Sequence, residues 1–103
     1  MKAVRPNAEA EEEIRAAIVW YENERQGLGR ELWDEVKATV DLISQYPEIG
    51  SVVNRAKVRG TARRVPLRRF PYFVVYRERL DYIELVALAH TSRRPGYWKL
   101  RRG

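Results

Sequence analysis

The chain of 103 residues carries 20 Lys and Arg against 14 Asp and Glu, a formal net charge of +6, and 45% of its residues are hydrophobic. The absence of cysteine and the single histidine exclude disulfides, a thiolate nucleophile and a zinc-thiolate site. No apolar run approaches the roughly 20 residues that cross a bilayer, and no basic leader with an apolar core is visible. We therefore expect one cytoplasmic domain over residues 1–103, with no metal and no cofactor.

The charge is divided unevenly between the two halves of the chain. Residues 1–50 carry six Lys and Arg against eleven Asp and Glu, a net charge of −5. Residues 51–103 carry fourteen against three, a net charge of +11. We expect the basic second half to face a polyanion or an acidic partner.

The first half predicts a short strand followed by two amphipathic helices. Lys2 to Val4 is a candidate strand, and the first helix is expected to begin near Pro6 or Asn7, since proline suits a first helical turn. That helix should end at Gln26-Gly27-Leu28-Gly29, and the second at Pro47 to Gly50. Apolar residues recur at helical spacing in both: Ala10, Ile14, Ala17, Ile18 and Tyr21, then Leu32, Val36, Val40 and Ile43.

The second half predicts a small sheet. Arg63 to Leu67, Tyr72 to Arg77 and Tyr82 to Ala89 are rich in Val, Ile, Tyr and Phe and are separated by turn residues. Pro66 predicts that the first of these strands is an edge strand or has a bulge. The apolar residues of 51–62 fit neither the helical nor the strand spacing, so no element is predicted there. The order β-α-α-β-β-β predicts an α+β fold, with an antiparallel helical hairpin packed on one face of a mainly antiparallel sheet.

The last strand leads into His90 to Lys99, a segment rich in groups that can take part in chemistry. It places a histidine, two arginines and a phenol at the end of a strand. Such side chains can move a proton and stabilise charge on a phosphate. They also form a basic, aromatic surface that can bind a macromolecule without any reaction.

Several residues of this region also have a simple structural interpretation. A lone histidine at the end of an apolar strand is more often a hydrogen-bonded structural residue than a catalyst, which applies to His90. Pro95-Gly96 predicts a turn, and Trp98 is expected to pack over one side of the sheet. Arg101 and Arg102 are expected to form a solvated tail.

Short motifs along the chain carry a family resemblance. They are Trp20-Tyr21-Glu22, Leu28-Gly29, Arg63-Arg64, Arg69-Phe70-Pro71-Tyr72, Tyr76, and His90 followed by Arg93-Arg94-Pro95 and Tyr97-Trp98. In their order and spacing they resemble the RelE/ParE toxin superfamily over nearly the whole chain, and its ParE and plasmid-stabilisation branch most of all. The resemblance implies the toxin of a type II toxin–antitoxin pair, neutralised by the C-terminal segment of an antitoxin that also supplies most of the DNA binding. It further implies one of two mechanisms, inhibition of DNA gyrase in ParE-like members or cleavage of mRNA on the ribosome in RelE-like members.

The residues bear on the choice between these two mechanisms. Metal-free RNA cleavage needs an acid, a base and cations around the scissile phosphate. The candidates for proton transfer are His90 and Tyr97, and the candidate cations around the phosphate are Arg64, Arg68, Arg93 and Arg94. Arg64 and Arg68 are expected on one side of a strand. Tyr72 to Tyr76 and Tyr82 to Ala89 contain no cation, although RelE-like members carry several across these strands. We therefore favour a gyrase inhibitor without catalysis, with ribosome-dependent mRNA cleavage as the alternative.

The remaining candidates are binding residues. Arg68 and Arg69 precede Phe70-Pro71-Tyr72, and a guanidinium there suits an acidic antitoxin segment or a phosphate. Trp20 and Trp33 fall off the apolar stripes of their helices, which favours an interface with the antitoxin, gyrase or a second copy. A basic nucleic-acid-binding domain is a third hypothesis, ranked last because no helix has the Lys/Arg face that enters a major groove.

Overall fold

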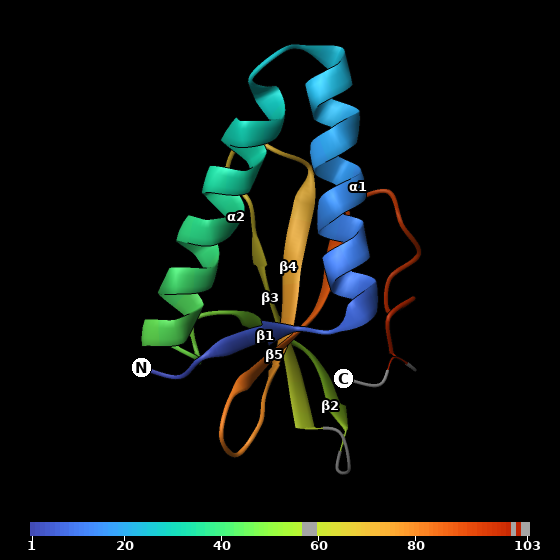
Figure 1. Cartoon of the computed structure of the whole chain (residues 1–103). Helices are drawn as coiled ribbons and strands as arrows, with labels where there is room; N and C mark the ends of the chain where they lie inside the picture. Colours follow the sequence, from blue (N-terminus) through green and yellow to red (C-terminus); the bar gives the residue numbers. More distant parts are fainter. Residues whose placement is uncertain (57–59, 100, 102–103) are drawn as a thin grey trace.

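The computed structural model, which describes residues 1–56, 60–99 and 101, places two helices over one face of a five-stranded sheet (Figure 1). The elements in chain order are β1 (Val4–Pro6), α1 (Ala8–Glu24), α2 (Leu28–Gln45), β2 (Ser51–Ala56), β3 (Gly60–Pro66), β4 (Tyr72–Glu78) and β5 (Ile83–His90). The order across the sheet is β1-β5-β4-β3-β2, and β1 and β5 are parallel while the other neighbours are antiparallel. The predicted α+β fold is confirmed, with one strand more than expected.

The chain passes from β1 into α1 without a loop. Pro6 is the last residue of β1, so its expected place in the first helical turn was wrong. Asn7 caps the helix instead, because its side-chain oxygen accepts the N–H of Ala10 at 2.8 Å. The backbone N–H of Asn7 also donates to the carbonyl of Leu85 at 3.0 Å, which ties the start of the helix to β5.

The turn between the helices explains two of the short sequence motifs. Gly27 adopts a left-handed conformation with φ of +90°, and the Glu22 carboxylate accepts the N–H groups of Gly27 and Gly29 at 3.0 Å. A Cβ on Gly29 would lie 2.7 Å from the carbonyl oxygen of Ile18, so only glycine permits this close approach of the helices. Within the described part of the chain, neither helix is long and apolar enough to cross a membrane.

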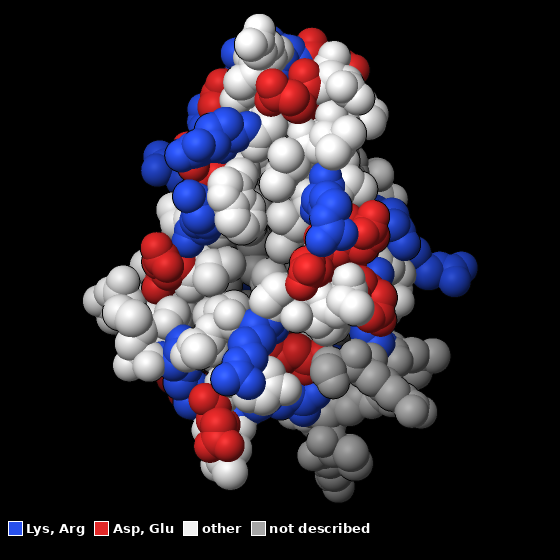
Figure 2. All heavy atoms as spheres, in the orientation of Figure 1, with Lys and Arg blue, Asp and Glu red and all other residues white. Residues whose placement is uncertain are grey.

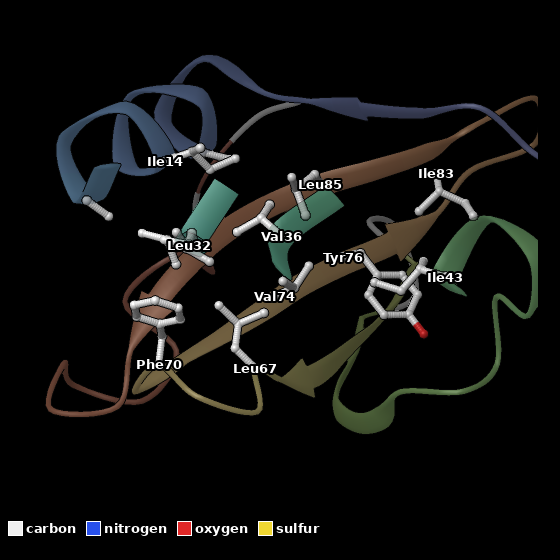
Figure 3. Close-up of a cluster of buried hydrophobic side chains, with 13 residues drawn as sticks. Ile14, Leu32, Val36, Ile43, Leu67, Phe70, Val74, Tyr76, Ile83 and Leu85 are labelled. Atoms are coloured by element: carbon white, nitrogen blue, oxygen red, sulfur yellow. The ribbon is translucent and has the colours of Figure 1, made fainter. Parts of the chain in front are cut away.

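The main core fills the space between the helices and the sheet (Figure 3). Ile14 of α1 and Leu32 and Val36 of α2 point toward Val74 and Leu85 on the central strands. These residues are at most 8% exposed. The apolar stripes predicted for both helices therefore face the sheet, and their burial supplies much of the driving force for folding.

The hydroxyl of Tyr76 on β4 fixes the turn that follows α2. The Tyr76 hydroxyl donates to the carbonyl of Pro47 at 2.8 Å and accepts the N–H of Gly50 at 2.9 Å. A Cβ on Gly50 would lie 2.8 Å from that hydroxyl oxygen. Glycine at this position thus allows the chain to cross close to β4 as it enters β2.

Residues 51–62, left unassigned from the sequence, include β2 and the first residues of β3, while residues 57–59 lie outside the described part. A register shift between Val52 and Asn54 interrupts the pairing of β2 with β3, which accounts for the poor alternation there. The prediction that Pro66 marks an edge strand or a bulge was wrong. β3 lies between β2 and β4, and Pro66 falls beyond the last β2 pair, Ser51 with Arg64, where no ladder N–H is needed.

The sheet face away from the helices has its own core. Trp98, only 5% exposed, packs there with Val75 and Val86, which confirms its predicted packing role. Arg77 of β4 is also fully buried, with its guanidinium 5.5 Å from the centre of the Trp98 ring. The expectation that the last two strands contain no cation was therefore wrong, because β4 continues beyond Tyr76 through Arg77 to Glu78.

We predict that Leu32→Ala lowers the free energy of unfolding by about 2–5 kcal/mol, because it leaves a cavity at a fully buried position. Leu80→Ala is the matched control, since Leu80 is 91% exposed in the β4–β5 turn, and it should change stability by less than about 0.5 kcal/mol. Urea denaturation of both variants measures the difference. Equal effects would contradict the assignment of the core.

Candidate functional site

An open cavity of about 290 Å³ lies on the sheet face away from the helices, beneath the segment that follows β5. Phe73 and Val75 of β4 and Val53 of β2 belong to its sheet side. The polar residues that line it include Arg64 on β3, His90 at the end of β5, and Arg93, Arg94 and Tyr97 in the following segment. The fold therefore brings together five of the residues selected from the sequence.

His90 has a hydrogen-bonded structural role at the end of β5. Its Nδ1 accepts the backbone N–H of Ser92 at 3.0 Å and lies 2.8 Å from the Ser92 hydroxyl oxygen. The ring also packs edge-to-face against Tyr72, with the centroids 5.0 Å apart. Because Nδ1 accepts the backbone N–H, this contact occupies the ring nitrogen that faces the turn. The side chain shapes the turn out of the strand.

Tyr97 is held by a carboxylate on helix α1. Its hydroxyl donates to Glu13 at 2.6 Å, and burial together with this hydrogen bond raises the pKa of the phenol well above its usual value of 10.0. The phenol therefore keeps its proton at neutral pH. Tyr97 is a poor general base in this setting.

Arg101 completes this contact, which corrects the expected solvated tail. Its guanidinium binds the Glu13 carboxylate in a bidentate manner at 2.8 and 2.9 Å, with its side chain 16% exposed. It also donates to the carbonyl of Val86 at 3.2 Å, while Glu13 accepts the N–H of Leu88 at 3.1 Å. These groups hold the C-terminal segment against α1 and β5. Arg102, the other residue of the expected tail, lies outside the described residues.

Two of the cavity arginines lie over aromatic rings. The Arg64 guanidinium carbon lies 4.2 Å from the centre of the Phe73 ring, and that of Arg93 lies 3.9 Å from the centre of the Tyr97 ring. Because Tyr97 is itself fixed by Glu13, the position of Arg93 depends indirectly on helix α1. The arrangement supplies fixed positive charge rather than a proton-transfer pair.

Arg68 and Arg69 do not belong to this cavity. β3 ends at Pro66, so the expected placement of Arg64 and Arg68 on one side of a strand was wrong. The backbone N–H groups of both arginines donate to the Glu35 carboxylate on α2, at 3.2 Å for Arg69. The Arg69 guanidinium also pairs with Glu31 at 3.1 Å. Their part of the molecule is the loop between β3 and β4 where it contacts α2.

The two tryptophans selected from the sequence are exposed and lie beside different hollows. Trp33 is 38% exposed and lines a groove of about 650 Å³ between the helices, together with Pro6, Ile14 and Ile18. Figure 2 shows an uncharged strip between α1 and α2 on this face, with charges of both signs on either side. Trp20 is 57% exposed and lies at a separate hollow between α1 and the C-terminal segment.

Sequence reasoning missed Glu13 as a site residue. Glu13 belongs to a run of glutamates that looks like a solvated helix face, yet it falls three residues after Ala10 and four before Ala17, both buried. Its position on the apolar stripe was the available signal. Among residues 1–56, 60–99 and 101, no group of three or more histidine, aspartate or glutamate side chains could hold a metal ion.

Comparisons with known proteins agree with the fold. The sequence matches over residues 4–95 the family model described as "ParE toxin of type II toxin-antitoxin system, parDE". A solved structure of the "Chromosomal ParDE TA system from P. aeruginosa" is similar with a TM-score of 0.70 and 16% sequence identity, covering 87% of this chain and 96% of that chain. At this identity the likeness concerns the fold alone. A search of curated proteins found no significant match.

We predict that Glu13→Ala releases the C-terminal segment and accelerates hydrogen exchange at the Leu88 amide by about ten- to hundredfold. The variant removes a charge-assisted acceptor from Leu88, Tyr97 and Arg101. Glu12→Ala is the matched control because Glu12 is exposed and pairs with Arg15 of the same helix. Exchange followed by NMR decides the matter, and an unchanged rate in Glu13→Ala would contradict this role.

A second prediction concerns the pH dependence of stability. Since the folded-state pKa of Tyr97 is raised, the folded protein keeps a proton that the unfolded chain loses once the pH exceeds about 10. The free energy of unfolding should therefore fall as the pH rises above that value, and it should fall less steeply in Tyr97→Phe. Denaturation curves across this range test it, and identical slopes for the two proteins would contradict it.

Proposed function

We propose that this chain, which belongs to the ParE toxin family of type II toxin–antitoxin systems, inhibits DNA gyrase by binding and catalyses no reaction. One observation carries this proposal. Both proton-transfer candidates of the cavity are engaged in structural hydrogen bonds, His90 with Ser92 and Tyr97 with Glu13. The cavity thus keeps its cations but lacks a free acid–base pair.

The alternative, cleavage of mRNA on the ribosome, would require that pair. An acid or a base must reach the reacting group and hold a pKa near the working pH. The raised pKa of Tyr97 opposes its use as a base, and Nδ1 of His90 already accepts the Ser92 N–H. Ribosome-dependent cleavage would need both contacts to break first, which makes binding the simpler function.

Two surfaces support a toxin that works by contact. The groove beside Trp33 is apolar at its base and bordered by charges of both signs, Arg15 and Arg30 with Glu11 and Glu22, a combination that suits an amphipathic helix. The cationic cavity with Arg93 and Arg94 offers a second contact on the other side of the molecule. We propose the helical groove for the C-terminal segment of a cognate antitoxin, which would also supply most of the DNA binding. We propose a cytoplasmic location, because a toxin with these partners would meet gyrase and its antitoxin there.

The decisive experiment uses purified protein in a gyrase supercoiling assay and in a translation extract. We expect supercoiling to stop and mRNA to remain intact. His90→Gln should retain the inhibition within about threefold, whereas loss of a proton-transfer group would cost roughly 10²- to 10⁴-fold. Arg25→Gln, at an exposed position just after α1, is the control for the loss of a side chain outside the cavity.

Two outcomes would overturn this function. Normal supercoiling at saturating protein would exclude gyrase as the target. Fragmented mRNA in the translation extract, abolished by His90→Gln but not by Arg25→Gln, would instead favour the endoribonuclease. Circular dichroism of each variant establishes that the fold is retained.

A further inference from the structure

Three arginines at the cavity have no carboxylate partner in the described part of the chain. No Asp or Glu lines the cavity, and no carboxylate of the described residues lies within 4.0 Å of Arg64, Arg93 or Arg94. Other arginines are paired at 2.6–3.1 Å, namely Arg15, Arg25, Arg30, Arg69, Arg79 and Arg101. The cavity therefore gathers three arginine charges that no carboxylate of the described residues neutralises by direct contact.

Two of the three guanidinium groups are positioned before any ligand arrives. Arg64 lies over Phe73, and Arg93 lies over Tyr97, whose hydroxyl is fixed by Glu13. A guanidinium stacked by its face keeps the N–H groups along its edge available to an acceptor. Such preorganisation lowers the entropy cost of binding an anion.

The aromatic rings of the cavity are not accessible for stacking with a nucleobase. Trp98 is buried, and Phe73 and Tyr97 each have a guanidinium over the ring. Binding of single-stranded nucleic acid usually depends on free rings on which the bases stack. The cavity instead offers cationic edges, which suit the anionic group of a ligand rather than its base.

From this geometry we propose that the cavity is a binding site for a phosphate group, held by Arg64, Arg93 and Arg94. A carboxylate has two oxygens and is satisfied by one or two guanidinium forks, whereas a phosphate has enough oxygens to meet three. All three arginines are exposed to solvent, so a phosphate can enter directly. Binding involves no bond cleavage and needs neither His90 nor Tyr97 as an acid or a base.

The test is a titration of the full-length protein with sodium phosphate at constant ionic strength, followed by NMR of the arginine Nε–H and backbone amide signals. We expect saturable shifts at Arg64, Arg93 and the amides that follow β5. Arg64→Gln and Arg93→Gln should each weaken binding by about three- to tenfold, because each removes one fork from a solvent-exposed site. Arg30→Gln, which removes the same charge from α2, should change it by less than about twofold.

Sodium acetate at the same concentrations distinguishes the two kinds of oxyanion. Acetate that binds as tightly as phosphate would overturn the assignment to phosphate and indicate an acidic protein segment. An equal loss of phosphate binding in Arg30→Gln and Arg64→Gln would overturn the site, since only net charge would then matter. Arg94→Gln provides a third variant should Arg64→Gln or Arg93→Gln not fold.

Phosphate binding by the isolated protein does not depend on the target that the toxin inhibits. Supercoiling assays on the same preparations therefore test gyrase inhibition separately from phosphate binding. Phosphate binding without gyrase inhibition would contradict the proposed function alone. Gyrase inhibition without any phosphate-induced shift would overturn the phosphate site alone.

Discussion

The carboxylate of Glu13 joins three parts of the molecule that are far apart in the sequence. From α1 it accepts hydrogen bonds from the amide of Leu88 on β5, the hydroxyl of Tyr97 and the guanidinium of Arg101. β1 pairs with β5 only as far as Leu85, so Glu13 and Arg101 satisfy backbone groups that no strand reaches. The same contact holds Tyr97 beneath Arg93, and the cationic cavity therefore depends on helix α1.

The motifs that carry the family resemblance are largely internal contacts. Tyr21 on α1 packs edge-to-face against Phe70 and Tyr72, with centroids 5.0 and 6.2 Å apart, and Tyr72 in turn packs against His90. Burial raises the pKa of Tyr72 to about 12, which keeps this phenol neutral within the aromatic chain. The motif residues thus hold the helical hairpin on the sheet and fix the direction of the segment after β5. The groups they position are the ones available to a partner.

The uneven charge of the two halves is partly neutralised within the fold. Carboxylates of the acidic half receive the cations of the basic half: Glu31 and Glu35 bind Arg69, and Glu13 binds Arg101. The Arg69 pairs lie at the surface and individually contribute little stability, whereas the Glu13–Arg101 pair is mostly buried. The cavity on the far face of the sheet keeps Arg64, Arg93 and Arg94 without a carboxylate within 4.0 Å among the described residues.

The sequence by itself determined the two helices, the three C-terminal strands and the packing of Trp98, because periodicity and turn residues act over a few neighbouring positions. It also selected Arg64, Arg93 and Arg94, whose side-chain chemistry is evident without a fold. Only the tertiary structure decided that Arg68 lies off the strand, that Pro66 pairs with β4 but lies beyond the last β2 pair, and that Glu13 meets Arg101. Those outcomes depend on which strands become neighbours and on contacts across more than eighty residues, which no local pattern encodes. A contact of this kind, from Glu13, also engages the hydroxyl of Tyr97, whereas His90 is held by its near neighbour Ser92.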